Sequence, residues 1–293
     1  MTEHATARYG ARMYPCRPQE ALAAVVLSIT LCIGCTSITA STADRITGAL
    51  KYPAGELPGI AYGQLPDSPN TLIRIADRTH RKSRNRTKLI RARTALKKAD
   101  EAMPGSYEVL WRLARVGSVL SMRDSKHAAG WARECYASAI TATKHQPSKV
   151  EGYYYAAACS GLRAQHEPGK ASKLLEELIE HAEKAHELEP SYDNGGPRRT
   201  LGIIYTLAPS WPSGVGDLDE AIELLEDVLR EYPREPLNAF YLAEAYRKAE
   251  QYGKAKSLHK RAYRLGKQGH FGPEGSYYRK RIESALYQLR RQR

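Results

Sequence analysis

Apolar residues recur at helical spacing in paired segments through most of the second half of the chain. The strongest pattern runs from 193 to 265, where two such pairs follow one another, and two more degenerate pairs precede it at 107–143 and 150–188. Each pair predicts two antiparallel helices joined by a turn. Because one helical hairpin buries only part of its apolar face, we expect the hairpins to stack in sequence around a shared core.

Small and aromatic residues fall at fixed offsets within these hairpins. The last pair places Leu242, Ala243, Tyr246, Ala255 and Ala262 at the offsets of a tetratricopeptide repeat (TPR), and the pair before it fills the same roles with Leu201, Gly202, Tyr205, Ala221 and Pro233. The pattern predicts an all-α fold, a TPR-like solenoid of helical hairpins over residues 105–270. The intervals from Gly202 to Ala221 and from Ala157 to Leu178 exceed the regular repeat, which predicts long intra-repeat insertions that protrude on one edge.

The N-terminal residues 1–34 have the pattern of an export signal of the lipoprotein type. Three arginines precede the apolar run 21–34, which is too short to span a bilayer comfortably. The run ends in Leu31-Cys32-Ile33-Gly34-Cys35, which resembles a bacterial lipobox, so Cys35 is the expected lipidation site. Cys32 and Cys35 also form a C-x-x-C motif, but no second pair follows to complete a zinc site. Residues 35–70 are rich in Pro and Gly and are expected to be a tether.

The formal net charge of +13 is concentrated at two places. Residues 71–99 carry eleven Lys and Arg against one Asp, and residues 276–293 carry six against one Glu. We therefore expect a basic helix at 71–104 and a basic C-terminal helix at 271–293, on either side of a near-neutral repeat body. Such charge suits anionic lipid headgroups, nucleic acid or a solvated capping helix. No aromatic residue interleaves the densely basic run to stack on bases, which makes nucleic acid an unlikely partner.

In a repeat array the first helix of each hairpin lines the concave face. Positions one residue after the small packed residue, or three before it, then point into the groove. The candidates for binding a partner in this groove are Trp111, Arg115, Tyr154, Arg199, Ile203, Phe240, Glu244 and Arg247. Aromatic and Arg side chains are the usual anchors of binding surfaces, so we hypothesise that the groove grips an extended peptide or an acidic group, with ordinary packing as the alternative for each residue.

Other candidate residues carry no catalytic signature. The side chain of Trp211 is expected to act as a plug that packs the inserted loop against a neighbouring hairpin. Cys135 and Cys159 are expected to be small core residues, and whether they form a disulfide is left open. His181 and His186 are five positions apart on one helix and cannot share a metal by themselves. We predict no catalytic residue, no metal site and no cofactor. The protein is expected to bind a partner or a ligand rather than to catalyse a reaction.

Three short motifs resemble those of the TPR lipoproteins associated with tripartite ATP-independent periplasmic (TRAP) transporters, the T-component family. They are Trp111-Arg112-Leu113-Ala114-Arg115, Gly195-Gly196-Pro197 and Ala208-Pro209-Ser210-Trp211-Pro212, and the first is also similar to eukaryotic microtubule-dynamics regulators. The resemblance implies a lipid-anchored repeat body that faces the periplasm and binds a substrate-binding protein or a small ligand. The leading expectation is thus a non-catalytic adaptor of the cell envelope. The alternatives are a small-ligand-binding lipoprotein with an apolar tunnel, or a basic cytosolic scaffold associated with nucleic acid.

Overall fold

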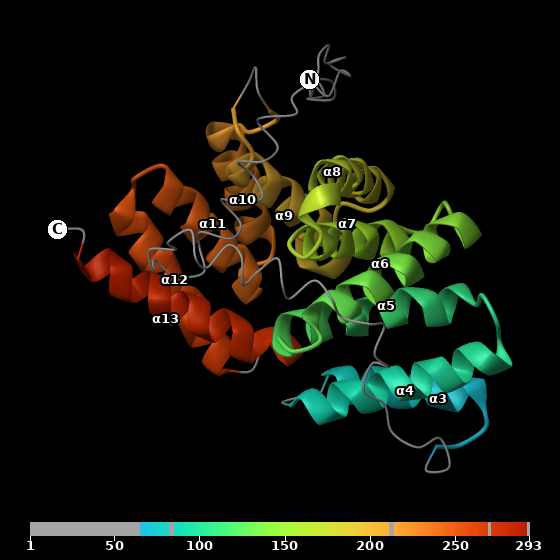
Figure 1. Cartoon of the computed structure of the whole chain (residues 1–293). Helices are drawn as coiled ribbons and strands as arrows, with labels where there is room; N and C mark the ends of the chain where they lie inside the picture. Colours follow the sequence, from blue (N-terminus) through green and yellow to red (C-terminus); the bar gives the residue numbers. More distant parts are fainter. Residues whose placement is uncertain (1–64, 82–84, 211–213, 269–270, 292–293) are drawn as a thin grey trace, which may run out of the picture.

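The computed structural model describes residues 65–81, 85–210, 214–268 and 271–291 (Figure 1). The described residues contain eleven α-helices, two 3-10 turns and no β-strand beyond an isolated bridge between Ser210 and Gly216. The all-α prediction is confirmed. The predicted signal peptide, Cys35, Trp211 and all but the last residues of the predicted tether lie outside the described residues.

The helices follow one another with short connections. Their bounds are α3 (Pro69–Arg81), α4 (Arg86–Ala102), α5 (Tyr107–Arg123), α6 (Ala128–His145), α7 (Val150–Ala164), α8 (Ala171–Leu188), α9 (Tyr192–Leu207), α10 (Leu218–Glu231), α11 (Pro236–Lys248), α12 (Tyr252–Lys267) and α13 (Gly275–Arg291). The 3-10 turns η2 (Pro168–Lys170) and η3 (Gly272–Glu274) precede α8 and α13. None of these described helices has the length and apolarity needed to cross a membrane.

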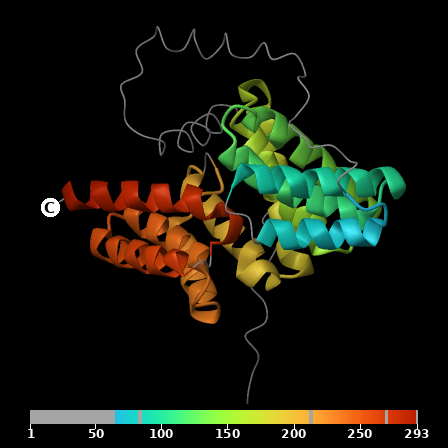
Figure 2. The same cartoon turned by 90° about the horizontal axis from the view of Figure 1, so that it is seen from below.

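Each odd-numbered helix from α3 to α11 packs against the even-numbered helix that follows it, as a hairpin. The first helices of successive hairpins also touch, α5 against α7, α7 against α9 and α9 against α11. The hairpins therefore stack into a curved superhelix whose inner wall consists of the odd-numbered helices (Figures 1 and 2). The expected insertions lie between α9 and α10 and, around η2, between α7 and α8.

Small residues let the two helices of a hairpin approach closely. Ala114, Ala157, Gly202 and Ala243 occupy this position on α5, α7, α9 and α11, and none has a side chain that reaches solvent. At Gly202 the space is tightest, because a Cβ there would lie 2.6 Å from Cγ of Leu225, which is fully buried on α10. Only glycine allows α9 and α10 this separation.

The segment 71–104, expected as one basic helix, forms two helices that pack against each other. Asn85 starts the second of them: its side chain accepts a hydrogen bond from the backbone N–H of Lys88 at 3.0 Å, as an N-cap does. Leu72 on α3 and Leu89 and Leu96 on α4 are fully buried and join the core that continues into α5. The basic segment is therefore the first hairpin of the stack.

A disulfide joins Cys135 on α6 to Cys159 on α7. Both residues are fully buried, and their Cα atoms lie 5.6 Å apart, within the range that a disulfide spans. Both are core residues as expected, and the bridge covalently links the second hairpin to the third.

The C-terminal end of the chain returns to the first hairpins. We call residues 271–278, which include η3 and the first turn of α13, the closing segment. η3 contacts α3 and α5, and a guanidinium N–H of Arg123 on α5 donates a 2.7 Å hydrogen bond to the carbonyl of Pro273. In Figures 1 and 2 the N-terminal end of α13 points toward the α3–α5 block. The superhelix is thus closed across its concave side.

The close approach of α9 and α10 gives a stability prediction. We expect Gly202→Ala to lower the free energy of unfolding by about 1–3 kcal/mol in urea titrations, because the added methyl group overpacks against Leu225. Gly253→Ala is the matched control, since Gly253 is exposed on α12 and an added Cβ meets nothing within 4 Å. It should leave stability unchanged or raise it by up to about 1 kcal/mol. Equal effects of the two substitutions would contradict the packing argument.

Candidate functional site

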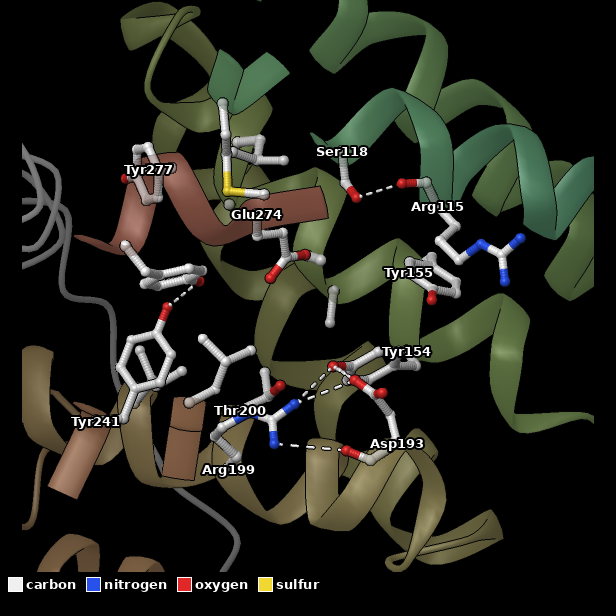
Figure 3. Close-up of a pocket in the computed structure, with 18 of the residues that line it drawn as sticks. Arg115, Ser118, Tyr154, Tyr155, Asp193, Arg199, Thr200, Tyr241, Glu274 and Tyr277 are labelled. Carbon is white, nitrogen blue, oxygen red and sulfur yellow. Dashed lines mark hydrogen bonds and ion pairs between the residues drawn. The ribbon is translucent and has the colours of Figure 1, made fainter. Parts of the chain in front are cut away.

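A cavity of about 790 Å³ lies inside the closed superhelix. Its wall comes mainly from the inner helices α3, α5, α7, α9 and α11, and from the closing segment on the opposite side (Figure 3). This volume is typical of sites for small organic molecules, which range from about 300 to 1,000 Å³. η3 closes one side of this cavity through its contacts with α3 and α5.

Six tyrosines line the cavity, from three inner helices and α13: Tyr154, Tyr155, Tyr192, Tyr241, Tyr277 and Tyr278. The ring of Tyr154 packs edge-on against Tyr155 and Tyr192 with centroids 5.2 Å apart in each pair. On the opposite side, the hydroxyls of Tyr241 and Tyr278 lie 2.8 Å apart. Burial raises the pKa of Tyr154, Tyr155 and Tyr278 well above the usual value, so these hydroxyls stay neutral. The cavity accounts for part of the unusual excess of 19 Tyr over two Phe.

A buried guanidinium joins three hairpins at the floor of the cavity. Arg199 on α9 is 3% exposed. It donates a hydrogen bond to Oδ1 of Asn238 on α11 at 2.7 Å. It donates another to the hydroxyl of Tyr154 on α7 at 3.2 Å (Figure 3). A third bond reaches Oδ2 of Asp193 at 3.2 Å. Burial opposes the charge of Arg199, but Tyr154 and Asp193 outweigh burial and raise its pKa. This cation is therefore fully engaged within the wall.

The backbone beside Arg199 is held in the left-handed region. Asp193, Asn194 and Gly195 have φ of +50°, +55° and +79°. For the two non-glycine residues this conformation costs about 1–2 kcal/mol each. Side chains from the neighbouring helices hold it: Tyr154 donates to the carboxylate of Asp193 at 2.7 Å, and Asn238 donates to the carbonyl of Asn194 at 3.2 Å. Backbone strain of this kind is typical of functional sites.

Glu274 on the closing segment extends its carboxylate into the cavity (Figure 3). The described residues supply it with no hydrogen bond and no ion pair. Burial raises the pKa of Glu274 to about 7; the carboxylates of Asp193 and Glu235 add to this effect, and Arg199 opposes it. Glu274 is therefore partly protonated near neutral pH, and its ionised form lacks a counter-ion.

Glu244 and Arg115, two other charged groups of the wall, have partners within the protein. Glu244 on α11 lies 3.0 Å from the Nε2 atom of His259 and 3.0 Å from a guanidinium nitrogen of Arg247. Burial opposes ionisation of Glu244, but the hydrogen bond with His259 and the charge of Arg247 outweigh burial and lower the pKa of Glu244 to about 2. Arg115 on α5 pairs with Asp77 on α3. Unlike Glu274, these groups are matched in charge.

Five of the eight predicted groove residues line the cavity: Arg115, Tyr154, Arg199, Ile203 and Glu244. Arg247 lies beside Glu244 but does not line the cavity. Trp111 and Phe240 are 8% and 1% exposed and lie in the core instead. The ring of Trp111 is stacked on Tyr155, and α13 covers Phe240 with Tyr278 and the guanidinium of Arg281. The prediction of groove residues from their offset to the small packed residue assumed that nothing covers the inner face. At Phe240 this assumption fails, because α13 covers the ring.

The closing segment and the next turn of α13 contribute residues that the repeat pattern did not single out, namely Glu274, Tyr277, Tyr278 and Arg281. They lie in the stretch that we expected to be a basic tail helix. One signal was present in the sequence: Tyr278, Ile282, Ala285 and Leu289 form an apolar stripe at helical spacing, and all four are buried. A stripe of this kind indicates a helix that packs against the protein.

The basic first hairpin uses several of its cations within the fold. Arg86 pairs with Asp124, Arg93 with Glu134 and Lys98 with Asp67, at 2.7–2.8 Å.

In the part of the chain that the structure describes, no group of three or more His, Cys, Asp or Glu residues could hold a metal ion. The described geometry thus points to the tyrosine-lined cavity rather than to a metal site.

Comparison with known proteins supports the fold and leaves the function open. The family model "Regulator of microtubule dynamics protein 1-3" matches residues 72–194, less than half of the chain, and no curated protein matches. A TPR protein of Thermus thermophilus, TTC0263, is similar in structure, with a TM-score of 0.56 and 18% identity over 75% of this chain and 100% of that one.

Two further structures are more distant. MamA matches with a TM-score of 0.40 and 18% identity, over 68% of this chain and 92% of that one. Yeast Tom70 matches with a TM-score of 0.45 and 17% identity, over 91% of this chain and 47% of that one. At 18% identity the similarity to TTC0263 concerns the fold alone, so the chain has a TPR-like fold and the site must be interpreted from its own residues.

The Arg199 network gives a stability prediction. We expect Arg199→Met to lower the free energy of unfolding by about 2–4 kcal/mol, because the fully buried Asn238 loses its donor and the left-handed turn loses an anchor. Arg230→Met is the matched control: the side chains of Arg230 and its partner Asp227 are 75% and 48% exposed, and such pairs contribute about 0–1 kcal/mol. Chemical denaturation of both variants measures the difference, and similar losses would contradict the role of Arg199.

Glu274 gives a prediction about pH. The unfolded chain ionises this carboxyl near pH 4.5 and the folded protein only near pH 7, so the native protein loses stability as pH rises through that interval. Glu274→Gln cannot ionise. Its advantage in free energy of unfolding over the native chain should grow from pH 4.5 to about 7 and then level off. Glu283→Gln, at an exposed position on α13, is the control and should follow the native profile. A constant advantage for Glu274→Gln across this range would refute the expectation.

Proposed function

We propose that this protein is a non-catalytic binding protein of the cell envelope that holds a small organic ligand inside its TPR superhelix. The observation that carries the proposal is the cavity of about 790 Å³, lined by six tyrosines and closed by η3 against α3 and α5. An extended peptide, the first occupant expected from the sequence, needs a groove that stays open along its length. The closing segment crosses that groove, which favours a compact occupant.

The envelope location rests on two features. The lipobox-like sequence that ends at Cys35 favours export and lipid anchoring. The disulfide between Cys135 and Cys159 supports the same location, because disulfides persist in oxidising compartments such as the periplasm. A cytosolic scaffold for nucleic acid would have neither feature.

The transport role rests on the sequence resemblance to the T components of TRAP transporters. In that role the protein would pass its ligand to or from a periplasmic substrate-binding protein, and its partner surface would lie near the mouth of the cavity. A single chain used in this way needs no cofactor and no catalytic residue, which agrees with the lack of a catalytic signature in its sequence.

Filling the cavity tests the ligand-binding proposal. Ala158 on α7 lines the cavity and is exposed to it, so a larger side chain there can fill the space without disturbing the core. We expect native mass spectrometry of the protein purified from its own host to detect a retained small molecule, and Ala158→Trp to lose it. Ala137→Trp is the matched control, because Ala137 is exposed on α6 and lies outside the cavity. Equal occupancy in all three proteins, or none in the native chain, would count against the proposal.

Labelling with radioactive palmitate tests the location separately. Incorporation should occur in the native chain and disappear in Cys35→Ala, with the protein then released from membranes. A chain that keeps its first thirty-four residues and remains in the cytosol would end the envelope proposal without affecting the cavity.

A further inference from the structure

We propose that the ligand carries a positively charged amine on an apolar or aromatic body, and that Glu274 receives the amine. This inference rests on the proposed function and names the chemical class that the cavity selects. Glu274 reaches the cavity from the closing segment, opposite the inner helices (Figure 3).

Charge balance in the wall leads to this assignment. Three carboxylates, those of Glu274, Asp193 and Glu235, lie close enough that the latter two affect the ionisation of the first. Asp193 accepts hydrogen bonds from Tyr154 and Arg199, and Glu235 accepts one from the backbone N–H of Leu237. Glu274 alone among them has no partner in the described part of the chain. A desolvated carboxylate is costly unless a cation compensates it, and an ammonium group would do so.

Tyr154, Tyr241 and Tyr278 line the same cavity as this carboxylate. Burial raises the pKa of all three tyrosines, and the charge of Glu274 adds to that effect. Tyr rings attract a cation over their faces, and a cage of such rings with one carboxylate is a general solution for binding organic ammonium groups. The predominantly apolar remainder of the wall, including Ile203, Ile204 and Leu207, would receive the ligand's body.

Three cations of the wall, Arg199, Arg115 and Arg281, are already engaged and do not favour an anionic ligand. Arg199 is bound to Asp193 and Asn238, and Arg115 is bound to Asp77. Arg281 lies over the rings of Phe240 and Tyr277, at 5.0 and 5.7 Å from their centroids, so those rings cover its guanidinium. An anion in the centre of the cavity would displace one of these arrangements and would also face Glu274 as a like charge.

Isothermal titration calorimetry with the full chain at pH 8 tests the proposal, using phenethylammonium and its uncharged counterpart 2-phenylethanol as probes. We expect the ammonium probe to bind at least about tenfold more tightly than the alcohol, because it forms a charge-assisted hydrogen bond with Glu274. Glu274→Gln should remove this preference and leave the affinity for 2-phenylethanol unchanged. Glu283→Gln, which removes an exposed carboxylate from α13, should bind both probes as the native chain does.

Lowering the pH gives a second readout. Between pH 8 and pH 6 the native affinity for phenethylammonium should fall as Glu274 takes up a proton. The charged groups that face Glu274 are Asp193 and Arg199 from α9 and Glu235 at the start of α11. The affinity for 2-phenylethanol should stay constant.

Three results would overturn the inference: no binding of phenethylammonium, equal binding of the two probes, or a Glu274→Gln variant that keeps the preference for the ammonium. None of these decides the proposed function. If the cavity holds a molecule of another class, Ala158→Trp still loses that molecule in native mass spectrometry. If the proposed function is wrong, Ala158→Trp and Ala137→Trp have the same occupancy.

Discussion

The charge of Arg199 is the constraint on which the interior of this protein depends. A guanidinium that is 3% exposed is unfavourable unless every side of it finds a partner. Its partners come from three successive hairpins, with Tyr154 on α7, Asp193 on α9 itself and Asn238 on α11. Apolar packing between hairpins tolerates a range of angles between the helices. The hydrogen bonds of Arg199 are directional, so all of them form only in one arrangement of the three hairpins. The same contacts hold the left-handed turn at Asp193 and Asn194, so one network both joins three hairpins and supports the local backbone strain.

The second determinant is a helix outside the repeats. TPR hairpins produce a concave wall, and proteins of similar fold share that wall whatever they bind. Here η3 and α13 lie across it, with Arg123 donating to the carbonyl of Pro273. In the proposed function, this closure changes the expected occupant from an extended segment to a compact molecule. It also brings Glu274 opposite Asp193 and Arg199, which gives the cavity its distinctive electrostatics.

The parts of this structure that could be predicted from sequence are those set by local spacing. Ala243 and Gly202 marked the helix contacts, and Arg115, Ile203 and Glu244, one position after a small residue, all line the cavity. The break at Asn85 was hidden because basic residues continue on both sides of it. The contact of Arg123 with Pro273 could not be predicted, since it depends on the sum of small rotations between all the intervening hairpins. Burial of Phe240 depends on Tyr278 and Arg281 of α13, a helix outside the repeat pattern, and was missed for that reason.

The return of η3 to α5 also has a kinetic meaning. In an open solenoid each groove position exchanges its occupant independently, and the residence time depends on local contacts. For the proposed ligand, a superhelix closed at this contact would have to flex before the ligand could leave, so escape would depend on bending distributed over the stacked hairpins. Such collective bending belongs to the microsecond-to-millisecond range of domain motions. A substitution far from the cavity that stiffens one hairpin interface would therefore lengthen the lifetime of a complex whose affinity it barely alters.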